Sequence, residues 1–70
     1  MTYEYQHISQ EDKNNMINEK ILYMEKNLYT LSLNKQEAEF RNDEKGLSAI
    51  NQEIDICLSI ISDLQAQKSL

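Results

Sequence analysis

The second half of the chain carries apolar residues at alternating steps of three and four positions, and this spacing strongly limits how it can fold. The apolar series consists of Leu47, Ile50, Ile54, Cys57, Ile61 and Leu64. Because an α-helix turns by roughly 100° per residue, the series lies along one side of a helix. The polar residues between its members are placed on the other side. Those that gather roughly opposite the apolar side are Ser48, Gln52, Asp55 and Ser59.

The first half of the chain has two apolar series at helical spacing. The main series consists of Ile17, Ile21, Met24, Leu28, Leu31 and Ala38, with Lys35 interrupting it. The narrower series, roughly 120–160° further around the helix, consists of Leu22, Tyr29, Leu33 and Phe40. One apolar face is enough to pack against one neighbouring helix. Two faces favour a further neighbour, either a second copy of the chain or a partner protein, over an exposed stripe that the protein tolerates.

Local signals suggest where the helices begin and end. Ser9 followed by Asp12 resembles a capping box, in which the shorter acid replaces the usual Glu or Gln. Asn42 can end a helix, Asp43 can cap the next one, and Gly46 can turn the backbone. We predict an extended arm over 1–8, a helix over about 9–41, a turn over about 42–46 and a helix over about 47–68.

These elements predict an all-α fold, a two-helix antiparallel hairpin that can dimerise into a four-helix bundle. A competing interpretation is one long coiled-coil helix, a structural segment of a larger assembly. It uses a repeat of seven residues formed by Leu33, Phe40, Leu47, Ile54 and Ile61. The seam of that coiled coil would have to accommodate Lys26, Gln36 and Asp43, and Gly46 would lie inside the helix. The hairpin is therefore favoured.

Composition argues against several classes of function. The net charge of −5 and the scattered Lys and Arg residues argue against a nucleic-acid partner. The apolar runs are too short and interrupted to span a membrane, and no secretion signal begins the chain, so we expect a cytoplasmic protein. His7 has no metal-ligand partner at a suitable spacing, and Cys57 belongs to the apolar series, so we expect a core cysteine and no metal site.

The polar residues opposite the apolar series are either a solvated surface or a functional edge. The chain has no Cys/His pair and no glycine-rich phosphate loop, and two helices cannot enclose a substrate. Any chemistry therefore depends on side chains that the helix lends to the active site of a partner.

A short motif lies within this region. Asn51-Gln52-Glu53-Ile54-Asp55 resembles the Ser-Gln-Glu-Leu-Asp signature of the stage-zero sporulation regulator E family, small helical-hairpin aspartyl-phosphate phosphatases of spore-forming bacteria. The resemblance covers roughly residues 17–62. It continues with apolar residues at Cys57, Leu58 and Ile61, although Ile61 replaces a common aromatic. Asn51 replaces Ser, Ile54 replaces Leu, and the polar connection before the motif is longer than usual in the family.

The resemblance implies a negative regulator of sporulation-type two-component signalling, whose partner is a phosphorylated response regulator. Gln52 and Asp55 are the implied catalytic residues, and the implied partner-binding residues are Ser48, Asn51, Glu53 and Ser59. The chain would need no cofactor of its own, because the receiver domain supplies Mg²⁺. The alternative is a non-enzymatic interaction protein, namely a dimeric bundle, an adaptor or an inhibitor. It would use Leu22, Tyr29, Leu33 and Phe40 as its self-association or partner face.

Overall fold

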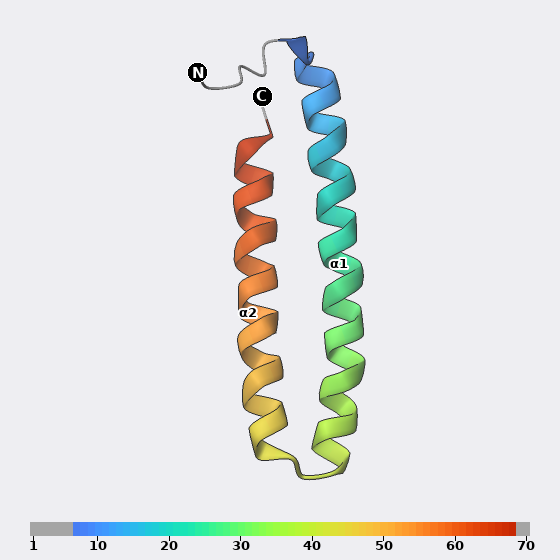
Figure 1. Cartoon of the computed structure of the whole chain (residues 1–70), viewed down its shortest axis with the longest axis vertical. Coiled ribbons are helices and arrows are strands. Elements are labelled where there is room, and N and C mark those ends of the chain that lie inside the picture. Colours follow the sequence, from blue (N-terminus) through green and yellow to red (C-terminus); the bar gives the residue numbers. More distant parts are fainter. Residues whose placement is uncertain (1–6, 69–70) are drawn as a thin grey trace.

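Two helices lie side by side and run in opposite directions in the computed structural model, which describes residues 7–68 (Figure 1). Helix α1 spans Gln10–Phe40 and helix α2 spans Glu44–Gln67. The predicted all-helical hairpin is confirmed, and the alternative of one continuous helix is wrong because the chain reverses direction between the two helices. Residues 1–6 of the predicted arm lie outside the described residues.

Helix α1 begins where its capping residues place it. The hydroxyl of Ser9 accepts a hydrogen bond from the backbone N–H of Asp12 at 3.0 Å. Glu11 and Asp12 occupy the first turn, where negative charge is favourable beside the free N–H groups of the helix end. No Pro or Gly interrupts the chain between residues 10 and 40, so the helix continues for 31 residues.

The end of α1 is a Schellman motif, a paired set of hydrogen bonds that closes a helix C-terminus. The backbone N–H of Asp43 donates to the carbonyl of Ala38 at 2.9 Å, and that of Asn42 donates to Glu39 at 3.1 Å. Asn42 has a φ of 55°, in the left-handed region that Asn tolerates better than most residues. This single residue turns the chain out of α1, as its chemistry predicts.

Helix α2 begins three residues earlier than the apolar spacing predicts, at Glu44 rather than near 47. The Asp43 side chain caps it by accepting a hydrogen bond from the backbone N–H of Gly46 at 2.9 Å. Gly46 therefore lies in the first turn of the helix and not in the connection. A Cβ atom at Gly46 would require the Asp43 carboxylate to shift from its present position. The periodicity missed this turn because Glu44 and Lys45 are polar and exposed.

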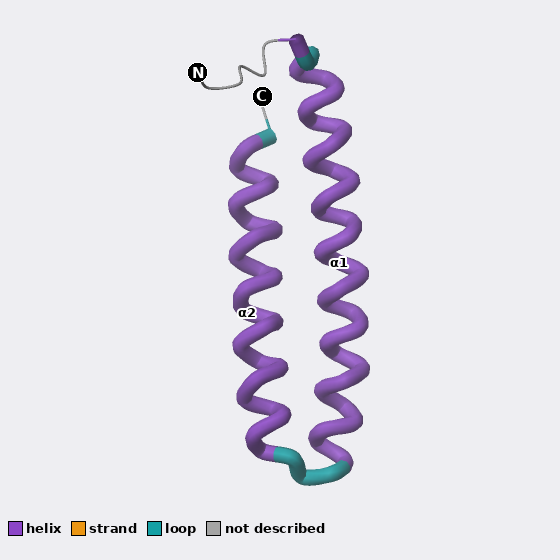
Figure 2. The backbone as a smooth tube through the Cα atoms, viewed as in Figure 1, coloured by secondary structure: helices purple, strands orange, loops and turns teal. Residues whose placement is uncertain are grey.

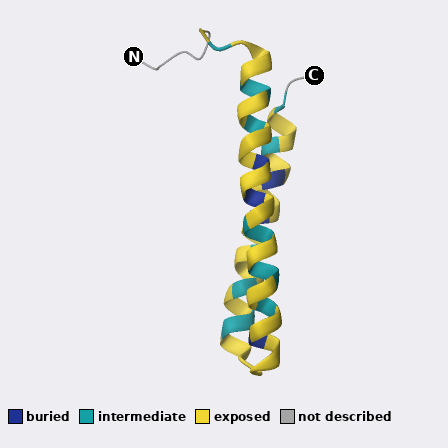
Figure 3. Cartoon of the chain, turned by 90° about the vertical axis from the view of Figure 1, so that its right-hand side faces the viewer, coloured by how far each residue is buried: buried dark blue, intermediate teal, exposed yellow. Residues whose placement is uncertain are grey.

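The core lies between the helices and is small. Ile21 and Met24 of α1 cluster with Cys57 and Ile61 of α2, and each of the four is less than 10% exposed. The partly buried residues packed against this cluster are Ile17, Leu28, Leu31 and Leu64. Figure 3 shows most of the buried positions in one part of the rod. The remaining buried residue, Ala38, belongs to the last turn of α1, beside the connection. The two main apolar series thus form the interface, and Lys35, half-buried, lies between its members.

The two helices differ in length, so their far ends do not coincide. The connection joins them at one end of the rod, and α1 continues past the end of α2 at the other (Figure 2). Near that end the ammonium group of Lys68 donates a hydrogen bond to the side-chain oxygen of Asn18 at 2.9 Å, which ties the helices together. In the described part of the chain, neither helix has the length and apolar character needed to cross a membrane.

Asn42 provides a test of the connection. Asn42→Ala is expected to lower the free energy of unfolding by about 1 kcal/mol, because Ala is disfavoured at positive φ. Asn42→Gly is expected to keep or slightly raise stability. Urea denaturation followed by circular dichroism measures both, with Arg41→Ala as a neighbouring control. Equal stability of the Ala and Gly variants would contradict the left-handed conformation.

The core has a test with a matched control on the same helix. Ile61→Ala is expected to cost about 2–4 kcal/mol, because it leaves a cavity between the helices. Ile56→Ala, at a position that is 51% exposed, is expected to cost less than about 1 kcal/mol. Thermal and urea denaturation distinguish these outcomes, and similar losses at both positions would argue against the observed interface.

Candidate functional site

The polar residues of α2 form a continuous strip on its outer face. The strip, here called the polar strip, consists of Ser48, Gln52, Asp55 and Ser59, all of which are exposed. Steps of three and four residues bring these side chains to the side of α2 that faces away from α1. Asn51 and Glu53 lie beside the strip and are also exposed. Ile54, the apolar member of the motif, is half-buried toward the hairpin interface.

The motif side chains are held by no other group within the described residues. Gln52, Glu53 and Asp55 make no hydrogen bond or ion pair with the described part of the chain. Between Gly46 and Gln67 the sequence has three carboxylates and no Lys or Arg. The amide and carboxylates therefore remain free for a binding partner, and that partner would have to supply the positive charge.

Apolar side chains lie on both sides of the polar strip, a feature that the periodicity did not single out. Ile56 lies on the side of Gln52 and Glu53, and Leu58 lies on the side of Asp55. Both are about half exposed. In the sequence, Ile56 and Leu58 can be recognised as apolar residues of α2 that do not belong to the series that forms the core. A strip of polar groups bordered by apolar side chains is typical of a surface that contacts another protein.

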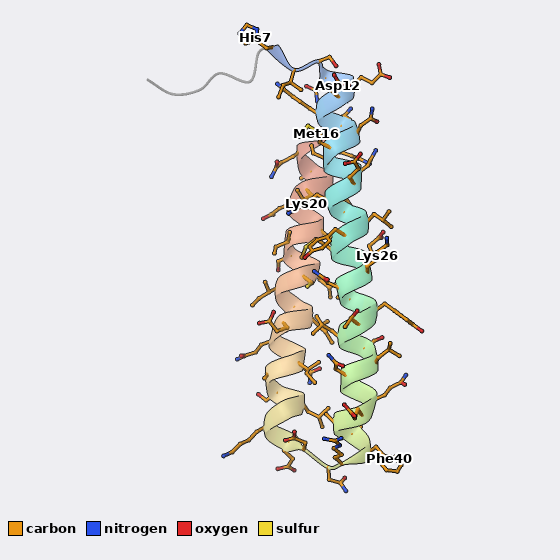
Figure 4. The ribbon with its side chains drawn as sticks, turned by 45° about the vertical axis from the view of Figure 1, so that its right-hand side comes forward. His7, Asp12, Met16, Lys20, Lys26 and Phe40 are labelled. Atoms are coloured by element: carbon orange, nitrogen blue, oxygen red, sulfur yellow. The ribbon has the colours of Figure 1, made fainter. Side chains whose placement is uncertain are left out.

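A second surface lies on α1. Leu22, Tyr29, Leu33 and Phe40, here called the outer stripe, are 52%, 67%, 46% and 90% exposed. Figure 4 shows Phe40, together with Lys26 at the same side of α1, pointing away from α2. Within residues 7–68, this second apolar series therefore has no neighbouring element packed over it. Other large apolar residues of α1 are exposed singly, and one of them, Tyr23, has the Lys20 ammonium 5.4 Å from its ring centre.

The two surfaces do not meet. The polar strip and the outer stripe lie on opposite sides of the hairpin, because each is on the face of its helix remote from the other helix. Each surface is the outer side of a single helix in a rod that measures 51 × 24 × 17 Å. Neither surface encloses a ligand by itself, so each is suited to contact a macromolecule. The predicted site residues of α2 are thus brought to one surface, while the apolar residues of α1 form another.

The side chains that commonly ligate metals form no cluster in residues 7–68. No three side chains of the types His, Cys, Asp and Glu come together there as metal ligands. His7 is exposed at the start of the described chain, and Cys57 is buried in the core.

Comparison with known proteins adds no assignment. No family model, no curated protein and no solved structure matches this chain.

Burial of Cys57 gives a direct probe of the hairpin. At 6% exposure, its thiol is expected to react with an aromatic disulfide reagent only when the helices separate, and rapidly in denaturant. In a Cys57→Ala background, Ser59→Cys places a thiol on the polar strip and is expected to react at once. Comparable reaction rates for Cys57 in the native chain and for the introduced Ser59→Cys thiol, both measured without denaturant, would contradict the arrangement of α2.

Proposed function

We propose that this chain binds the phosphorylated receiver domain of a response regulator and promotes hydrolysis of the aspartyl phosphate, as a negative regulator of sporulation-type signalling. One observation carries the proposal. The polar residues of the motif that resembles the stage-zero sporulation regulator E signature are all exposed on α2, while its apolar Ile54 is turned toward the core. A motif used for partner chemistry requires this separation of its polar and apolar members.

The reaction requires little covalent chemistry from the hairpin. Water attacks the phosphorus, the bond between phosphorus and the aspartyl oxygen breaks, and inorganic phosphate and a free carboxylate result. The receiver provides the Mg²⁺ that neutralises charge on the phosphoryl oxygens. The hairpin then has to place one water molecule in line with the bond that breaks. A helix that lies over the receiver's phosphorylation site can do this.

Gln52 is suited to orient that water. Its side-chain carbonyl can accept a hydrogen bond from the water, and its NH₂ group can donate to a phosphoryl oxygen. The amide is neutral, so it approaches the phosphoryl group without repulsion. Its side chain is exposed and has no partner within the described chain. We therefore assign the water-orienting role to Gln52.

Asp55 has a different constraint. A carboxylate close to a phosphoryl group is repelled unless a cation lies between them, and α2 has no basic residue between Gly46 and Gln67. The cation must come from the receiver, either as Mg²⁺ or as a basic side chain of the loops around the metal. Asp55 therefore contacts the metal-site loops, while Glu53, at the side of the polar strip, sets the docking angle. Ser48, Asn51 and Ser59 extend the contact surface along α2.

Substitution of the two motif residues tests the proposal. Gln52→Ala and Asp55→Ala are each expected to slow phosphate loss from a radiolabelled receiver by about a hundredfold. The first variant loses the amide that orients the attacking water, and the second loses the carboxylate that contacts the metal-site loops of the receiver. Helicity should not change, because both side chains are exposed. Phosphate release from a panel of labelled receiver domains is measured, with Gln65→Ala as an exposed control on α2. Wild-type rates in both variants, or no acceleration by the native chain with any receiver, would overturn the assignment.

A second candidate function rests on the outer stripe. Four exposed apolar residues on α1 favour a non-enzymatic interaction protein, whose hairpin forms a dimeric bundle or covers a partner as an adaptor or inhibitor. The two functions differ in one measurement. The interaction protein forms its complex through α1 and leaves the rate of phosphate loss unchanged.

A further inference from the structure

The hairpin by itself buries little apolar surface. Among residues 7–68, five apolar side chains are buried, and only four of them form one cluster. Chains of this size commonly need a disulfide, a metal or association with another chain to supplement such a core. A disulfide within the chain is excluded by its single cysteine. The exposed outer stripe is the largest reserve of apolar surface that α1 has left.

The spacing of the outer stripe is symmetric. Its members follow one another at steps of seven, four and seven residues, so the pattern is the same when read in either direction along α1. Two identical helices placed antiparallel therefore align all four residues at once. In such a pair, Leu22 would lie level with Phe40 of the second copy, and Tyr29 would lie level with Leu33 of the second copy. A two-fold axis at the level of Leu31 would relate the copies, which is the closed symmetry of most homodimers.

We propose that two copies of this chain associate through the outer stripes of their α1 helices, with those helices antiparallel. The proposal is independent of the phosphatase function, because it uses α1 and leaves α2 untouched. The occupant of the stripe is a second copy, and the orientation follows from the position of the charged residues.

Lys26 distinguishes the antiparallel from the parallel arrangement. It lies within the span of the stripe, on the same side of α1 as Phe40 (Figure 4). In a parallel pair in register, Lys26 would lie beside Lys26 of the partner subunit, and the two like charges would repel. In the antiparallel pair, it lies level with Gln36 of the partner subunit and within one residue of the partner's Glu37. Lys26 therefore has a negatively charged neighbour, the partner's Glu37, in the antiparallel pair. In the parallel pair, its neighbour would be the positively charged Lys26 of the partner subunit.

The apolar area is sufficient for a stable contact. With large side chains offering about 150–250 Å² each, the exposed fractions of the four residues leave roughly 500 Å² per copy to be covered. Two copies together then bury about 1,000 Å² from these residues alone, near the lower limit for a specific interface. Flanking side chains add to this area.

One flank of the pair opposes association. Glu25 lies beside Leu22 and Tyr29, and in the antiparallel pair it faces Glu39 of the partner subunit at nearly the same level. Both residues are exposed in the hairpin. The repulsion occurs twice by symmetry, so the native dimer is expected to be weaker than its apolar area alone would give. This unfavourable contact also makes the orientation testable.

The dimer leaves the polar strips free. Each strip lies on the side of its hairpin remote from α1, so the two strips point away from each other at opposite sides of the four helices. A dimer could therefore contact two receivers at once, and loss of dimerisation would not by itself remove Gln52 or Asp55 from solvent.

Sedimentation equilibrium of the full chain across micromolar to submillimolar concentrations tests association. The native chain is expected to reach the mass of a dimer, and Leu33→Glu to raise the dissociation constant by about a hundredfold, since both copies lose a buried leucine. Leu58→Glu is the matched control, because Leu33 and Leu58 are 46% and 51% exposed but only Leu33 belongs to the outer stripe. A native monomer throughout, or equal effects of the two substitutions, would overturn the proposal.

Glu39→Lys tests the orientation. It converts two repulsive contacts with Glu25 into two attractive ones, and it is expected to tighten the dimer by about tenfold at low salt. Asp63→Lys changes the net charge equally at an exposed position on α2 and is expected to have a smaller effect. Equal tightening by both variants would show a general charge effect and would contradict the antiparallel pairing.

A distance measurement tests the same orientation without relying on affinity. A spin label at Asn15→Cys, in a Cys57→Ala background, lies 16 residues from the level of Leu31. The labels of an antiparallel pair are then roughly 48 Å apart along the helix axis, at 1.5 Å per residue, whereas those of a parallel pair are within about 20 Å. Circular dichroism confirms that the variant keeps its helices, and a short distance would refute the antiparallel arrangement.

Discussion

The packing of Ile21 and Met24 against Cys57 and Ile61 is the contact on which the rest of the structure depends. Individual helices of this kind gain most of their stability from tertiary packing, because nucleation is unfavourable and propensity adds little per residue. When this cluster forms, α1 and α2 become one rod, and every other side chain is assigned to an inner or an outer face. The polar strip and the outer stripe exist as surfaces because the cluster determines which side of each helix is hidden.

The connection determines the register of that contact. Asn42 turns the chain with a single left-handed residue, and Asp43 immediately caps the next helix. Only three residues separate α1 from α2, so there is little freedom to slide one helix along the other. The greater length of α1 then leaves its first turns beyond the end of α2, while Lys68 contacts Asn18 near the last turn of α2. Ala38, the smallest of the buried residues, lies in the last turn of α1, beside this short connection.

Two outer surfaces with different chemistry underlie the two contacts that we propose for the hairpin. The polar strip offers an amide and a carboxylate bordered by Ile56 and Leu58, and it lacks a cation, so its chemistry is complete only against a partner that brings one. The outer stripe offers apolar area with a symmetric spacing, which a second copy can match. Because the two surfaces lie on opposite sides of the rod, the proposed self-association and the proposed receiver binding need not compete. Under these two proposals, one small hairpin combines a contact for assembly with a contact for signalling.

The amino-acid sequence determined both helices and the inner face of α2, because the unbroken spacing of three and four in the second half of the chain has one helical solution. The residue chemistry of Ser9, Asn42 and Asp43 also identified three of the chain's helix caps. It did not determine the start of α2, since the polar first turn from Glu44 to Gly46 carries no periodicity. Nor did it decide between a hairpin and one long helix, because the seven-residue repeat through Leu33 and Ile61 is compatible with both. Tertiary structure decided that choice through the backbone of Asn42. It also decided which apolar face of α1 is buried: the face with Ile21 and Met24 meets α2, and the face with Leu22 and Phe40 stays exposed. Local spacing is the same kind of signal for both faces, and only the position of the neighbouring helix distinguishes them.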